Sequence, residues 1–127
     1  MSWVALATRR YDAVCAFYGT TLGCPVVDGW DRPSARATVF ELNGMRLEVL
    51  DASRERAVAL GDPKDRVHLV LEVANVDAFR SGIKGEVPEP HDTSWGARVL
   101  PLRDPDGIPV TVLAWTKGGT RPPAPTA

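Results

Sequence analysis

Glu48 and His68 are the side chains whose type and position in this 127-residue sequence allow chemistry. A carboxylate and an imidazole can share a divalent metal ion, or they can act together as general base and general acid. Both lie in a sequence that repeats once. Glu48 lies four residues after Gly44 near the end of the first half, and Thr111 lies four residues after Gly107 near the end of the second.

The repeat predicts a pseudo-symmetric cavity lined by four equivalent strand positions. Trp3 opens the first half and His68 opens the second, so these two match each other as Glu48 and Thr111 do. An indole N–H can only donate a hydrogen bond, and a threonine hydroxyl is a poor neutral ligand. Two protein donors fall short of the three that catalytic zinc sites and 2-His-1-carboxylate iron sites hold. We therefore expect no metal ion and no other cofactor.

Hydrophobic periodicity predicts the elements that position these residues. Strands are predicted over 3–8, 24–27, 35–42, 45–50, 67–73, 97–102 and 109–115, with extended chain over 86–90. Helices are predicted over 12–22, ended by Gly23, and after Asn75, which caps the second helix. Trp30 is expected in the loop that begins at Asp28, and Trp95 in a loop over 91–96.

The order βαβββ, present twice, predicts an α+β fold with a single domain over residues 1–115. Two modules, about 3–51 and 66–115, are joined by a linker over 52–65 that contains a short helix near 54–60. One face of each strand is aliphatic and suits a helix, so the mixed faces are expected to curl around a shared interior. Residues 116–127 are rich in proline and glycine and read as a disordered tail.

Composition excludes several classes of partner. With 24% charged residues and a formal net charge of −1, the chain offers no basic surface for nucleic acid. No apolar run reaches the roughly 20 residues that cross a bilayer, and the first residues do not resemble a signal peptide. The expected location is the cytoplasm, without a membrane partner.

Four short motifs, in order, resemble the vicinal oxygen chelate superfamily, which includes glyoxalase I, extradiol dioxygenases, fosfomycin-modifying enzymes and bleomycin-resistance proteins. They are Phe17-Tyr18 with Leu22-Gly23, Phe40-Glu41-Leu42, Trp95-Gly96, and Asp104-Pro105-Asp106-Gly107. The resemblance implies two βαβββ modules that form a U-shaped, partly open eight-stranded barrel around a central cavity. It also implies a homodimer, and metal ligands at the positions of Trp3, Glu48, His68 and Thr111. Since two of these four positions hold non-ligands, the chain is expected to be nearer to the metal-free, drug-binding members.

The first functional hypothesis is a metal-independent protein of the bleomycin-resistance type that sequesters an aromatic or apolar compound and so confers antibiotic resistance. Its expected ligand-binding residues are Trp3, Trp30, Arg46, Glu48, His68, Trp95 and Thr111. The alternative is a glyoxalase- or dioxygenase-like enzyme, a lyase or isomerase, that uses Glu48 and His68 as acid and base or as partial metal ligands. A module that only mediates protein interactions is the third possibility, in which these residues have structural roles.

Overall fold

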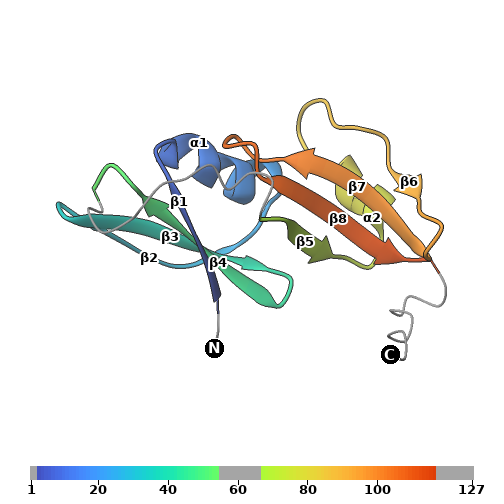
Figure 1. Ribbon diagram of the computed structural model, residues 1–127, viewed down its shortest axis with the longest axis horizontal. Helices are drawn as coiled ribbons and strands as arrows, with labels where there is room; N and C mark the ends of the chain where they lie inside the picture. The colour runs from blue at the N-terminus through green and yellow to red at the C-terminus, as the bar shows by residue number, and fades with distance from the viewer. Residues whose placement is uncertain (1–2, 55–66, 117–127) are drawn as a thin grey trace.

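Each half of the chain folds as a βαβββ module in the computed structural model, which describes residues 3–54 and 67–116 (Figure 1). The first module consists of β1 (Trp3–Thr8), α1 (Tyr11–Ala16) with a π-helical continuation η1 (Phe17–Thr21), β2 (Val26–Arg32), β3 (Ala35–Leu42) and β4 (Met45–Asp51). The second consists of β5 (Leu69–Glu72), α2 (Val76–Ser81), β6 (His91–Asp92), β7 (Ala97–Arg103) and β8 (Pro109–Trp115).

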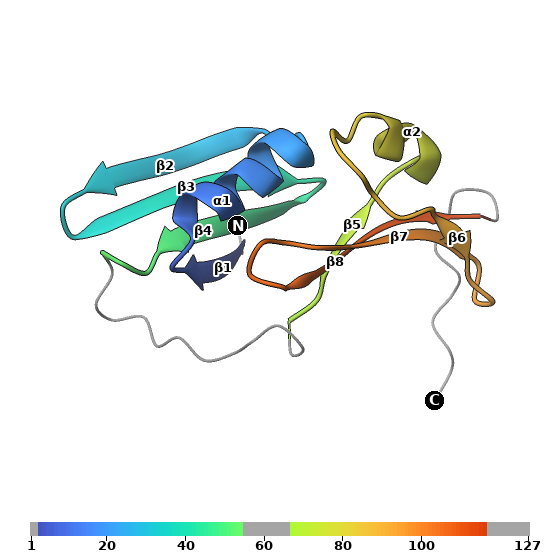
Figure 2. The same ribbon diagram turned by 90° about the horizontal axis from the view of Figure 1, so that it is seen from above.

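The described strands form two separate four-stranded sheets. Sheet 1 has the order β1-β4-β3-β2 and sheet 2 the order β5-β8-β7-β6. In both, the first strand of the module pairs in parallel with the last, and the remaining pairs are antiparallel. Seen from above, the modules lie side by side, each with its own helix (Figure 2). The predicted α+β class is therefore confirmed, with sheets that do not close into a complete barrel.

The first helix follows from the spacing of its apolar residues. Val14, Tyr18 and Leu22 recur every four residues and are all buried against sheet 1. Gly19 allows the helix to lie close to Phe40 of β3, because a Cβ at position 19 would be only 3.0 Å from Cε1 of Phe40. Gly23 then ends the helix with a φ of +71°, a conformation that glycine adopts without strain.

A single buried cluster joins the two modules. Tyr18 and Leu47 of the first module share it with Leu71 and Val110 of the second. Two hydrogen bonds between the modules reinforce this packing. The Tyr18 hydroxyl donates to Oδ2 of Asp104 at 2.8 Å. Nδ2 of Asn43, in the turn between β3 and β4, donates to the Glu72 carbonyl at 2.9 Å. The relative placement of the sheets is therefore fixed by burial and by hydrogen bonds.

Three sequence predictions about local structure were wrong. Trp30 lies on β2, which continues to Arg32 past a register shift between Val26 and Asp28, so the expected loop is a bulged edge strand. The expected loop over 91–96 begins with the two-residue strand β6, because His91 pairs with Val99. Strand β5 is shorter than expected.

The predictions for the second helix, the linker and the tail can be compared with the structure only in part. Asn75 caps α2 as predicted, since its side chain accepts a hydrogen bond from the Ala78 N–H. The helix expected near 54–60 lies outside the described residues except for Arg54, and the predicted tail does so except for Thr116. No helix in the described ranges is long and apolar enough to span a membrane.

Candidate functional site

Each sheet has one face under its helix and one face that no helix of residues 3–54 or 67–116 covers, which we call its open face. Register and alternation place the mixed side chains predicted for the cavity on these open faces. The open face of sheet 1 carries Trp3, Ala5, Ala7, Trp30, Ala37, Val39, Arg46, Glu48 and Leu50. The open face of sheet 2 carries Val70, Glu72, Ala97, Val99, Pro101, Thr111, Leu113 and Trp115, with His68 just before β5.

Trp3 and Glu48 form the first of two pairs. They lie on the neighbouring strands β1 and β4, where Trp3 is opposite Arg46 and Glu48 is opposite Ala5. Burial raises the pKa of the Glu48 carboxyl above its ordinary value, and a hydrogen bond with the Trp3 side chain offsets the rise only in part. Glu48 is thus a carboxyl that holds a proton more readily than an exposed one.

His68 and Thr111 form the second pair, on sheet 2. Nε2 of His68 lies 2.6 Å from Oγ1 of Thr111, and the tautomer of the ring decides which atom donates. The sequence repeat predicted one cavity lined by all four residues, whereas in the structure each residue at the start of a module pairs with one on the last strand of the same module.

These four positions do not fit a metal centre within one chain. Of the four residues, only Glu48 and His68 can ligate a metal, and they lie on different sheets. Their neighbours, Trp3 and Thr111, cannot supply the third protein ligand that a catalytic metal site needs. Over residues 3–54 and 67–116, no three His, Cys, Asp or Glu side chains are grouped so that they could hold an ion.

A third cluster on the open face of sheet 2 consists of Trp95, Trp115 and Glu72. The ring centroids of the two tryptophans are 5.8 Å apart at an interplanar angle of 68°. Nε1 of Trp115 donates to Oε1 of Glu72 at 2.5 Å. The sequence analysis named Trp95 but neither of the other two. The signal was the alternation of β5 and β8, which places Glu72 two residues beyond Val70 and Trp115 two beyond Leu113.

Trp30 and Arg46 complete the predicted set and lie on the open face of sheet 1. Trp30 is half-buried opposite Ala37, on the edge strand β2. Arg46 is half-buried as well, with its Nε 3.6 Å from a carboxylate oxygen of Glu41, its register partner on β3. Both side chains share this face with Trp3 and Glu48, whereas Trp95, His68 and Thr111 belong to the other module.

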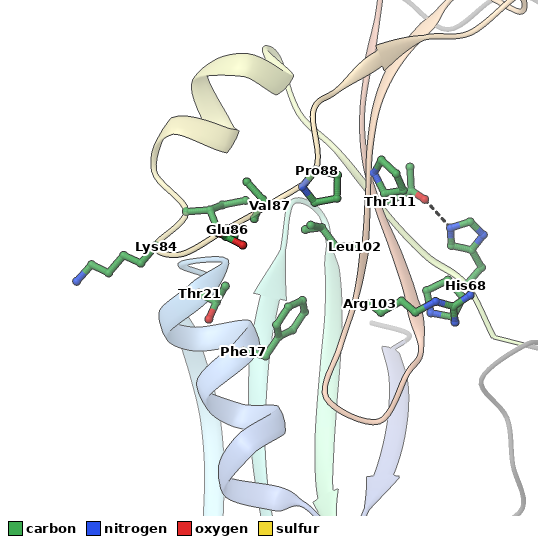
Figure 3. Close-up of a pocket in the computed structure, with 13 residues that line it drawn as sticks. Phe17, Thr21, His68, Lys84, Glu86, Val87, Pro88, Leu102, Arg103 and Thr111 are labelled. Atoms are coloured by element: carbon green, nitrogen blue, oxygen red, sulfur yellow. Dashed lines mark hydrogen bonds between the residues drawn. The ribbon is translucent and has the colours of Figure 1, made fainter.

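A groove of about 500 Å³ lies between the modules (Figure 3). Its apolar walls include Phe17, Ile83, Val87 and Leu102, from the helix-covered side of the structure. His68 and Thr111 also line it, but Figure 3 shows them on the other side of the β7 and β8 ribbons from Phe17 and Thr21. The groove therefore reaches one of the two pairs, and Trp3 and Glu48 are not among its lining residues.

Residues 1–112 match the family model of the Glyoxalase/Bleomycin resistance protein/Dioxygenase superfamily. The chain belongs to this superfamily. The match spans both modules up to the middle of β8, so it includes all four register positions. No curated protein matches the chain.

Solved structures of other superfamily members share the fold. Lactoylglutathione lyase from Agrobacterium tumefaciens is 23% identical, with a TM-score of 0.64 over 89% of this chain and 91% of that one. The fosfomycin resistance protein FosX from Listeria monocytogenes is 16% identical, with a TM-score of 0.64 over 92% and 93%. TnmS3, an antibiotic binding protein from Streptomyces, is 19% identical, with a TM-score of 0.59 over 88% and 94%.

Proposed function

We propose that this protein binds an aromatic or apolar small molecule on its open sheet faces without a metal ion, as a sequestering protein of the bleomycin-resistance type. The observation that carries the proposal is the exposure of large apolar side chains there. Trp3 is 61% exposed, Trp95 55% and Val70 50%. Soluble proteins seldom leave such groups uncovered together unless something binds to them.

The polar side chains on the same faces suit a binding site rather than a metal centre. Glu48, Arg46, His68 and Thr111 supply a few hydrogen-bonding groups among apolar ones, which is the usual composition of a small-molecule site. A stacked aromatic contact adds about 0.5–1.5 kcal/mol beyond the area that it buries, so micromolar binding needs several such contacts. The superfamily includes an antibiotic binding protein, TnmS3, which supports this class of ligand.

Tryptophan fluorescence tests the proposal directly. Planar aromatic compounds, including antibiotic-like natural products, are expected to quench the fluorescence saturably. Trp3→Ala and Trp95→Ala should each weaken binding about 5- to 30-fold if the ring stacks on the ligand. Val26→Ala is the matched control, because Val26 is 62% exposed but projects from the opposite face of sheet 1. No saturable quenching across a broad panel would refute the proposal.

One observation favours an enzyme as the second candidate. Burial raises the pKa of Glu48, which suits a carboxyl that exchanges a proton with a substrate. In this alternative Glu48 and His68 serve as acid and base for a lyase or isomerase reaction. Turnover of small oxygenated acids or aldehydes by the purified protein, abolished in Glu48→Gln and unaffected by chelators, would replace the sequestration proposal.

We also propose a homodimer. The open faces leave Trp3, Val70 and Trp95 exposed, and the edge strands β1, β2, β5 and β6 have one side unpaired in the described chain. A second copy placed against these surfaces would bury them and enclose a ligand between chains.

A further inference from the structure

We propose that Trp95, Trp115 and Glu72 form a site for an organic cation with a flat aromatic body. The inference rests on the proposed function and specifies the ligand class. The two indole rings stand at 68° to each other with centroids 5.8 Å apart, so they form two walls of a corner. The negative face of an indole attracts a cation and also stacks on an aromatic ring.

Glu72 gives the corner its charge. Its Oε1 accepts the hydrogen bond from Trp115 Nε1, which fixes the carboxylate beside the ring. Among residues 3–54 and 67–116, no Lys, Arg or His nitrogen lies within 4.0 Å of the Glu72 carboxylate to neutralise it. On this face β8, the strand that pairs with β5, carries Thr111 and Leu113 next to Val70 and Glu72, and both are uncharged. A bound cation would therefore complete an ion pair that the described chain leaves incomplete.

The loop that carries Trp95 is already ordered for binding. Thr93 and Ala97 close it, with the Thr93 N–H donating to the Ala97 carbonyl at 2.7 Å and the Ala97 N–H donating to Thr93 Oγ1 at 3.1 Å. The Gly96 carbonyl accepts from the Thr116 N–H at 3.0 Å, which ties the loop to the end of β8. The loop between β6 and β7 lies at this end of sheet 2 in Figure 1. Little ordering entropy then remains to be lost on binding.

The floor of the corner is apolar. The basic residues on this face lie away from Glu72: His68 is four residues before it, Arg103 is opposite Pro109 at the far end of β8, and His91 is on β6 at the opposite edge of the sheet. Val99 and Leu113 are buried on the open face beneath Trp115, and Val70 is half exposed beside Glu72. Arg98, the basic residue on the neighbouring part of β7, projects to the helix side, where it pairs with Asp77 and Asp92. The corner thus combines apolar area, two aromatic faces and one negative charge, which favours a planar cation over a neutral or anionic analogue.

Three flat probes of equal ring size test this charge preference. Proflavine is cationic near neutral pH, acridine is neutral and acridine-9-carboxylate is anionic, and each is titrated against the protein by tryptophan quenching. Proflavine is expected to bind roughly five- to tenfold more tightly than acridine, and the anion most weakly. Glu72→Gln keeps an acceptor for Trp115 but removes the charge, so it should abolish the difference between proflavine and acridine. High ionic strength should weaken proflavine binding to the wild-type protein more than to this variant.

Control variants separate the cation site from general effects. Glu89→Gln removes one negative charge at a distant exposed carboxylate that pairs with Arg80, so it should leave the preference intact. Trp95→Ala should weaken both proflavine and acridine. Circular dichroism and the urea midpoint verify that each variant is folded.

Three results would overturn the inference. Equal binding of proflavine and acridine, unchanged in Glu72→Gln, would refute the cation preference but leave the proposed function standing. Failure of every probe to bind would refute both. If Trp95→Ala halves the mass measured by light scattering without affecting proflavine, the corner is a contact between subunits and the inference is wrong.

Discussion

Removal of one hydroxyl group from the interface between the modules should destabilise the protein in a pH-dependent way. The Tyr18 ring is completely buried, and its hydroxyl donates to Oδ2 of Asp104, which is 4% exposed. The other carboxylate oxygen, Oδ1, accepts the N–H groups of Asp106 and Ile108 at 2.9 and 3.0 Å. Tyr18→Phe keeps the ring and its packing but leaves Oδ2 without this donor in a dry interior.

The magnitude follows from the desolvation of that oxygen. An unsatisfied buried acceptor costs about 1–3 kcal/mol, and a charged acceptor lies toward the upper end of this range. We expect Tyr18→Phe to lower the free energy of unfolding by about 2 kcal/mol near pH 7. Urea denaturation followed by circular dichroism measures the change.

The sign of the pH dependence comes from Asp104. Burial raises the pKa of its carboxyl, and the bonds from Ile108, Tyr18 and Asp106 offset this only in part. A carboxyl with a raised pKa in the folded state favours folding while it is protonated, and this contribution is lost as the pH rises through the folded pKa. Without the Tyr18 hydroxyl the pKa rises further. The cost of Tyr18→Phe should therefore fall to about 1 kcal/mol or less near pH 3.5, where Asp104 is protonated.

Tyr11→Phe is the matched control. The Tyr11 hydroxyl lies 2.5 Å from Oγ1 of Thr38 in a partly buried, neutral pair. Its loss should cost about 1 kcal/mol at both pH values. If Tyr18→Phe costs the same at both, or costs no more than the control near pH 7, the account of Asp104 as a buried charge held by Tyr18 is wrong.

Three other outcomes are expected. Elemental analysis should find substoichiometric Zn, Ni, Mn and Fe, whereas one tightly held ion per chain, lost in Glu48→Gln, would overturn metal-independent binding. Light scattering at micromolar concentration should give twice the 13.8 kDa chain mass, and a monomer would contradict the proposed dimer. Arg36→Met should lower the free energy of unfolding by about 1–3 kcal/mol near pH 7 and by less near pH 3, as denaturation at the two pH values will show.

The last prediction rests on the carboxylate of Asp51, which is 3% exposed and lies 2.8 Å from the Arg36 guanidinium. Burial alone would raise the pKa of Asp51, but hydrogen bonds from Ser53 and Arg36 outweigh it and lower the pKa. A lowered folded pKa gives stability that is present above the unfolded pKa and disappears as the pH falls through the folded value. An equal cost at both pH values would contradict this assignment.

Local pattern predicted most of the elements and the two faces of β1, β4, β5 and β8. Alternation in β4 and β8 separated buried Val49 and Val112 from Glu48 and Thr111 on the open faces. The repeat identified Trp3, Glu48, His68 and Thr111 as equivalent positions, but not the division into Trp3 with Glu48 and His68 with Thr111. These features depend on residues close in sequence or on strand periodicity, which the sequence records directly.

The features that were missed depend on contacts distant in sequence. Trp30 was assigned to a loop because Asp28-Gly29 is a turn signal, but pairing with β3 draws both residues into a bulged strand. The bond from Trp115 to Glu72 requires the parallel pairing of β5 with β8, and the bond from Tyr18 to Asp104 joins different modules. Local sequence propensity does not predict contacts between residues so far apart in the chain.

The pairing of each module's first strand with its last has a consequence during synthesis. β1 can pair with β4 once residue 51 has left the ribosome, so sheet 1 can be completed while the second module is still being translated. Its helix side then exposes Tyr18 and Leu47 until Leu71 and, finally, Val110 arrive to cover them. A chain arrested before β8 would hold a finished sheet with an uncovered apolar flank, and that nascent state is where a chaperone would be needed.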